Sequence, residues 1–141
     1  MTGAPEQEPE TKLYERNRTE IQNGHPKRKM NDIGGISMRR IRLEELPMVT
    51  SPRGPKIRKV VSTDDVAVAN VVLEPGQVLP SHKTPVDVLF YVHAGSGYVV
   101  IDDENIEVSA GDMVPSPKNI PHGLKAGEET DFSVLVIKTP N

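Results

Sequence analysis

The sequence predicts an all-β domain, folded as an antiparallel sandwich or barrel, that follows a polar N-terminal segment. From residue 36 onward, short runs rich in β-branched residues alternate with turn sequences such as Glu74-Pro75-Gly76 and Gly95-Ser96-Gly97. The turns recur about every eight to twelve residues, which is typical of antiparallel sheets rather than of β–α–β units. The chain has 141 residues, enough for one domain of ordinary size.

The N-terminal segment is too polar to build a core. Only seven of its first 35 residues are apolar, and its six basic and six acidic side chains cancel. We expect residues 1–35 to form a flexible tail that ends at a hinge at Gly34-Gly35, and residues 36–141 to form the barrel domain. An alternative left open is that the native chain starts at Met30 or Met38.

Ten strands are expected in the domain, each bounded by turn residues. The first two alternate basic with apolar side chains, as edge strands protected by charge do. The next two flank Glu74-Pro75-Gly76, the fifth and sixth flank the Gly95-Gly97 turn, and the seventh follows an acidic hairpin turn at residues 102–105. Of the last three, the eighth follows Gly111-Asp112, the ninth ends at the Ala126-Gly127 turn, and the tenth closes the domain. In order, the expected strands are 38–43, 57–62, 66–73, 78–82, 88–94, 98–101, 106–108, 113–115, 122–126 and 132–138.

The strand at 88–94 is apolar on both faces, which is unusual for an antiparallel strand. Val88, Phe90 and Val92 share one face, and Leu89 and Tyr91 share the other. Burial of both faces requires a second layer, either a further sheet or a second subunit. The pattern therefore favours a homodimer.

Composition excludes several classes of function. A formal charge of −3 offers no excess of positive charge for nucleic acid, and no apolar run approaches the length of a membrane span. The chain has no Cys, which removes disulfides, thiolate nucleophiles and Cys-ligated zinc and is compatible with a cytoplasmic location. Any metal must be held by oxygen ligands or by the four His residues.

The segment from Gly76 to Ala126 resembles the two motifs of the cupin superfamily. Those motifs read Gly-x5-His-x-His-x(3–4)-Glu-x6-Gly and Gly-x5-Pro-x-Gly-x2-His-x3-Asn. This sequence matches them in register at Gly76, His82, Gly95, Gly111, Pro117 and His122. The resemblance implies a double-stranded β-helix, or jelly-roll barrel, in which the motif residues converge.

The resemblance also implies a metal site of three His and one Glu, and this chain departs from it at two positions. Thr84 stands in place of the second His, and the Glu position holds Val88 at the x3 spacing or Leu89 at the x4 spacing. Asp87 is one residue away, but a step of one along a strand turns a side chain to the opposite face. His82 and His122 remain as candidate metal ligands, with Thr84 and Asn70 as neutral oxygens.

Two imidazoles hold a divalent ion weakly, because zinc sites generally use three or four protein ligands. A divalent metal (Zn, Fe, Mn or Ni), weakly bound or absent, is therefore left open. Of the other two His residues, His93 should point away from the barrel interior and His25 lies in the tail. Without a metal, buried neutral His residues can act as bases or hydrogen-bond partners, as in the metal-free epimerases of this superfamily.

The sequence thus predicts a protein that binds a small molecule inside a barrel. The candidate ligand-binding residues are His82, Thr84, Val88, Phe90 and His122. The alternative is an enzyme of the isomerase, epimerase or dioxygenase type, either metal-dependent or metal-free. Its catalytic residues are not identified by the sequence.

Overall fold

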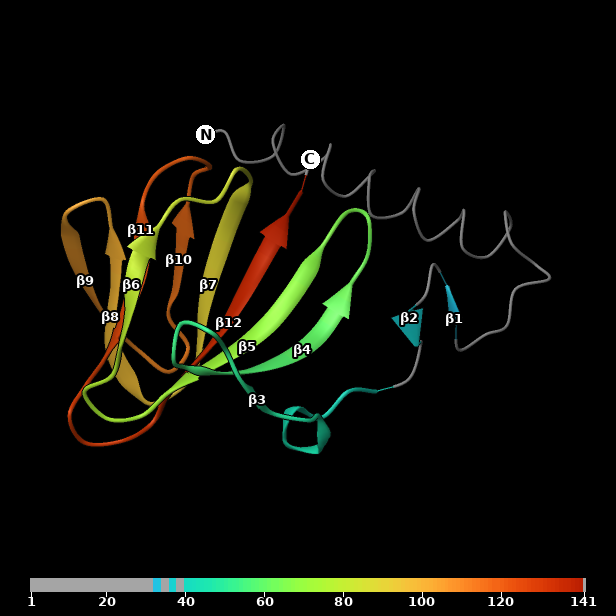
Figure 1. Cartoon of the computed structure of the whole chain (residues 1–141), viewed down its shortest axis with the longest axis horizontal. Coiled ribbons are helices and arrows are strands. Elements are labelled where there is room, and N and C mark those ends of the chain that lie inside the picture. Colours follow the sequence, from blue (N-terminus) through green and yellow to red (C-terminus); the bar gives the residue numbers. More distant parts are fainter. Residues whose placement is uncertain (1–31, 34–35, 38–39, 141) are drawn as a thin grey trace, which may run out of the picture. The chain divides into compact units, whose positions relative to one another are not determined.

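The computed structural model describes residues 32–33, 36–37 and 40–140 (Figure 1). The chain divides into two units, Met1–Met38 and Arg39–Asn141, which are described separately. In the first unit, β1 (Asp32–Ile33) pairs with β2 (Ile36–Ser37) in an antiparallel ladder that was not predicted. Most of the predicted tail, its hinge at Gly34-Gly35 and His25 lie outside the described residues.

The second unit consists of two antiparallel sheets that face each other (Figure 1). The six-stranded sheet has the order β10-β7-β12-β5-β4-β3, and the four-stranded sheet has the order β6-β11-β8-β9. Nine of the ten predicted strands are confirmed, as is the predicted all-β barrel fold. The strands are β3 (Val49–Thr50), β4 (Lys56–Ser62), β5 (Ala67–Leu73), β6 (Val78–His82), β7 (Asp87–Ala94), β8 (Ser96–Ile101), β9 (Glu104–Ser109), β10 (Met113–Ser116), β11 (His122–Ala126) and β12 (Phe132–Thr139).

The strand predicted at 38–43 is wrong in its described part. Residues 40–42 belong to no strand, and the short 3-10 helix η2 (Leu43–Glu45) follows them. This segment has the alternation of an edge strand, but none of the described strands pairs with it. The Glu45 amide instead closes a local turn onto the Arg42 carbonyl. Among the described residues, no helix is long and apolar enough to span a membrane.

The core lies between the two sheets and takes side chains from both. Leu73, Val92 and Phe132 of the six-stranded sheet are fully buried, as are Val99 and Leu124 of the four-stranded sheet. Because side chains alternate along a strand, each strand also presents a second, outer face. On β5, Ala69 and Val71 face the interior of the barrel.

The turn between β7 and β8 needs glycine. Gly95 has φ of 81°, in the left-handed region that favours glycine. A side-chain carbon at this position would also overlap the carbonyl of Asp131. The sequence pattern Gly95-Ser96-Gly97 is therefore a structural turn, as predicted.

Candidate functional site

Two imidazoles meet at one end of the barrel because of strand pairing. His82 ends β6, His122 begins β11, and the two residues are direct partners in the antiparallel ladder. Opposed residues in such a ladder share a face, so their side chains must lie together. Their ring centroids are 4.9 Å apart, and the ring planes are nearly perpendicular, at 87°.

His122 is held by three side chains from different elements. Its Nε2 is 3.0 Å from Thr84 Oγ1, and its Nδ1 is 2.8 Å from Ser116 Oγ. The ring of Phe90 on β7 packs edge-on against it, with ring centroids 5.2 Å apart. His122 is 3% exposed and Ser116 is 1% exposed, so this cluster is closed to solvent.

Burial also fixes the charge state of His122. Desolvation is the main cause that lowers its pKa to about 4, with smaller effects from His82, Lys138 and Arg53. The ring is therefore neutral near pH 7. A neutral imidazole has one donor and one acceptor nitrogen, and the two hydroxyls satisfy both.

His82 has fewer partners than His122. Its Nδ1 lies 3.4 Å from the Pro80 carbonyl, a long contact, and Nε2 makes no hydrogen bond with any described residue. Its pKa is lowered mainly by burial; the Pro80 contact opposes this shift, and the charges of Arg53 and Lys138 add to it. His82 is thus the imidazole that has a nitrogen available to a ligand.

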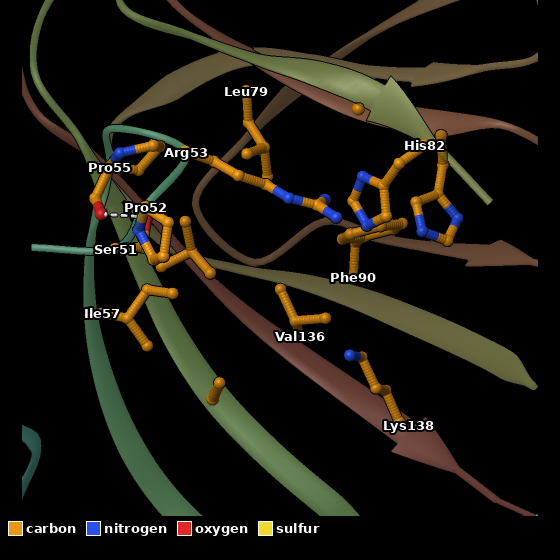
Figure 2. A pocket seen from close by; sticks show the side chains of 14 residues that line it. Ser51, Pro52, Arg53, Pro55, Ile57, Leu79, His82, Phe90, Val136 and Lys138 are labelled. Carbon is orange, nitrogen blue, oxygen red and sulfur yellow. Dashed lines mark hydrogen bonds between the residues drawn. The ribbon is translucent and has the colours of Figure 1, made fainter. Parts of the chain in front are cut away.

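Both imidazoles line a cavity of about 290 Å³ inside the barrel (Figure 2). This volume is slightly below the range of roughly 300–1,000 Å³ that is typical of small-molecule sites. Most of the wall is apolar, and it draws on both sheets and on the loop between β3 and β4. The apolar lining residues are Pro52, Pro55, Ile57, Ala69, Val71, Leu79, Phe90 and Val136.

Two cationic side chains complete the lining, and neither was predicted. Arg53 extends from the β3–β4 loop toward His82, and Lys138 extends from the end of β12 (Figure 2). The sequence held a signal for Lys138, because it follows Phe132, Val134 and Val136 at a spacing of two on one face. No such signal existed for Arg53 in its loop. Ser116 was also missed, although it directly opposes Val88 in the β10–β7 ladder.

The predicted ligand-binding residues take different places. His82, His122 and Phe90 line the cavity, and Thr84 is 7% exposed and contacts His122. Val88 is buried in the core and is not among the residues that line this cavity. The loop before β11 fixes Thr84, because the Asn119 amide donates to the Thr84 carbonyl at 2.8 Å.

Three other residues point away from the cavity. Asn70 is a neighbour of Val71 on β5 but faces the other side of the sheet, so it is not the metal-ligand oxygen considered above. It donates to Ser133 Oγ at 2.9 Å and accepts from Arg58 at 2.9 Å. Asp87 accepts from the Lys118 amide, and His93 is exposed, both in agreement with the expected outward direction.

The residues present do not fit a bound divalent metal. Among the described residues, no three His, Asp or Glu side chains are grouped so that they could hold one. Both nitrogens of His122 are already bonded to hydroxyls, so a metal would have to break one of these hydrogen bonds. Arg53 and Lys138 line the same cavity and would repel a cation.

Comparisons with known proteins agree with this fold. The family described as Cupin domain matches residues 69–138. No curated protein matches the chain. The polyketide cyclase RemF from Streptomyces resistomycificus is 21% identical, with 74% of this chain and 80% of that chain covered and a TM-score of 0.66. KdgF from Halomonas sp. is 26% identical, with 70% and 89% of the two chains covered and a TM-score of 0.64. A predicted oxalate decarboxylase from Thermotoga maritima is 18% identical, with 72% and 98% of the two chains covered and a TM-score of 0.64. At 21% and 18% identity, the first and third show likeness of fold alone.

Proposed function

The chain belongs to the cupin superfamily, and from this premise we propose that it binds a small organic molecule in the barrel cavity that contains His82 and His122. The observation that carries the proposal is the cavity itself, which joins apolar walls to a few convergent polar groups. His82 contributes a nitrogen without a protein partner among the described residues. Phe90, Leu79 and Val136 provide apolar contact.

The Thr84–His122–Ser116 cluster has a supporting role in this proposal. Its hydrogen bonds are satisfied within the protein, so it offers a fixed, neutral wall rather than a free ligand. Metal chemistry is not part of the proposal, because the donor set does not fit a divalent ion. Binding is therefore proposed to depend on shape, apolar contact and hydrogen bonds.

Filling the cavity provides a direct test. Ala69 lines the cavity from β5, so Ala69→Leu should place three extra carbons inside it. In a two-dimensional ¹H–¹⁵N NMR titration, we expect benzamide to shift the amide signals of cavity residues in the wild type and not in Ala69→Leu. An apolar pocket loses its ligand when a side chain occupies the same volume.

The matched control is Ala94→Leu, which adds the same atoms at an exposed position at the end of β7. This variant should respond to benzamide as the wild type does. If benzamide shifts no cavity signal in the wild type, or if Ala69→Leu keeps the full response, small-molecule binding in this cavity is contradicted.

A second candidate function is metal-free proton transfer by His82. The Nε2 of His82 bonds to no described residue and its pKa is lowered, and both favour this function, because a neutral imidazole with an available lone pair can act as a base. In the part of the chain that the structure describes, no carboxylate lines the cavity to orient this ring, so binding remains the first proposal. The two candidates differ in whether the bound molecule is chemically altered.

A further inference from the structure

We infer that the cavity selects small organic carboxylates, which Arg53 and Lys138 recognise by charge while the apolar walls hold the body of the ligand. This inference rests on the proposed function and names its ligand class. It is carried by the placement of the two cations and by the charges around them, which are taken in turn below.

Arg53 is held by a short, well-bonded loop between β3 and β4. Ser51 donates from Oγ to the Pro55 carbonyl at 2.7 Å and from its amide to the same oxygen at 2.9 Å, and the Gly54 amide donates back to Ser51 at 3.0 Å. Pro55 is buried and anchors the loop against the barrel. The base of the Arg53 side chain is therefore fixed, and its guanidinium extends over the cavity toward His82 (Figure 2).

Lys138 reaches the same cavity from the six-stranded sheet. It follows Val134 and Val136 on the inner face of β12 and directly opposes Val88 of β7. At this end of the barrel the interior opens, and the Lys138 side chain is exposed. Its amino group turns into the cavity (Figure 2). Two cations from separate elements thus converge on one apolar space.

Among the described residues, no acidic side chain balances the charges of this site. None of the described residues that line the cavity is acidic. Within the described part of the chain, the one ion pair joins Arg42 to Glu45, so neither Arg53 nor Lys138 has a carboxylate within ion-pair distance. The whole chain carries a formal charge of −3, so the positive charge here is local and not a consequence of a basic composition.

The neighbouring surface continues the same sign of charge. A second hollow shares Ala69, Val136 and Lys138 with the cavity, and Lys59 of β4 lines it. Cations grouped beside low-dielectric walls favour an anion, and a carboxylate can pair with the Arg53 guanidinium through two parallel hydrogen bonds. The mostly apolar lining selects a carboxylate that carries a hydrocarbon body rather than a bare inorganic anion.

The test compares benzoate with benzamide, which have nearly the same shape and differ in charge. In NMR titrations near neutral pH, we expect benzoate to bind the wild type about tenfold more tightly than benzamide, a typical effect of one charged contact. Arg53→Gln and Lys138→Gln should each weaken benzoate binding about tenfold and weaken benzamide binding much less, because only benzoate carries a charge. Both positions are exposed, so the variants should fold normally.

Lys56→Gln is the matched control, because Lys56 is an exposed cation next to Ile57 on the opposite face of β4. It should bind benzoate as the wild type does. Equal affinity for benzoate and benzamide would overturn the carboxylate inference while leaving small-molecule binding intact. Equal losses in Lys56→Gln and Arg53→Gln would also overturn it, because they would indicate an effect of net charge. Inorganic phosphate that binds as tightly as benzoate would contradict the required hydrocarbon body.

Discussion

His122 is a buried residue whose charge the fold controls. Its two nitrogens are bonded to Thr84 and Ser116, and Phe90 excludes water from one side. A hydroxyl stands here where the metal-binding pattern of the superfamily has a second His, so the same position serves a neutral hydrogen-bond cluster. Thr84 in place of a His therefore makes His122 a structural residue, bonded within the protein, rather than a metal ligand.

The stability of the protein should fall as pH decreases through the range set by His122. The pKa of His122 is about 4 in the folded state and 6.5 in the reference state, so the unfolded chain binds more protons between these values. Its contribution is complete above pH 6.5 and is lost as the pH falls toward 4. When the pH falls from about 7.5 to about 5, protonation linked to His122 should lower the free energy of unfolding by about 2 kcal/mol.

Urea unfolding of the wild type and His122→Gln at both pH values measures this effect. Gln is uncharged throughout, so the difference in unfolding free energy between the two proteins should shrink by about 2 kcal/mol at the lower pH. His82→Gln is the comparison, because His82 is less buried and should contribute less. A difference that does not change with pH would contradict the buried neutral state of His122.

The elements that shape the site are short and depend on local backbone geometry. The β3–β4 loop presents Arg53 to the cavity. At the turn before β11, Asn119 has φ of 65°, and its amide donates to the carbonyl of Thr84. In β11 the pairing register shifts between His122 and Leu124, and a side-chain carbon at Gly123 would lie 2.6 Å from the Leu79 carbonyl. The glycine lets β6 approach β11 closely enough for His82 and His122 to meet.

Two glycine positions separate backbone strain from steric overlap. Gly95 and Gly111 both have positive φ, of 81° and 96°, but an added side-chain carbon would overlap another backbone segment only at Gly95. We expect Gly111→Ala to lower the free energy of unfolding by about 1–2 kcal/mol, the cost of strain alone. Gly95→Ala should cost more than about 3 kcal/mol, because Asp131 must also move.

Thermal and urea unfolding of the two variants in parallel gives this comparison. Equal destabilisation would mean that the β7–β8 turn can move away from Asp131. That result would contradict the close approach seen between this turn and the start of β12.

For the whole molecule, the barrel explains the apolar residues on one face of β7 and leaves those on the other face to be accounted for. The inner face packs into the core through Val88, Phe90 and Val92, which are all buried. The outer face carries Leu89 and Tyr91, which are half-buried, beside Met113 of β10, which is 55% exposed. The apolar character of this outer face supports the homodimer that we continue to propose.

A homodimer should appear as twice the 15.5 kDa mass of the chain in size-exclusion chromatography with light scattering. Met113→Glu places a charge on the outer face and should shift the population toward monomer, because an unpaired charge in an interface is costly. Val78→Glu makes the same change at a position that is 47% exposed on the other sheet, and it should leave the dimer intact. A monomeric wild type, or equal dissociation in both variants, would contradict a dimer through this face.

The sequence by itself determined the fold class and nine strands, and its resemblance to the cupin motifs implied that His82 and His122 converge. Alternation and turn residues are local signals, and they are reliable where neighbouring strands confirm them, as at β7 and β8. They failed at residues 40–43, the described part of the strand predicted at 38–43, which pairs with no other described strand. The spacing of the two cupin motifs also predicted that the second His and the Glu are missing, because a missing ligand residue can be read directly from the sequence.

Only the tertiary structure decided what fills the space around the two imidazoles. Arg53 reaches the site from a loop distant in the sequence from His122, and Ser116, only six residues before His122, bonds to it because β10 and β11 lie in different sheets. Asn70 was considered as an oxygen ligand inside the barrel, but Ala69 and Val71 on either side of it face inward, so Asn70 faces outward. The physical reason is that charge, burial and hydrogen-bond partners depend on long-range packing between the two sheets, which no local pattern encodes.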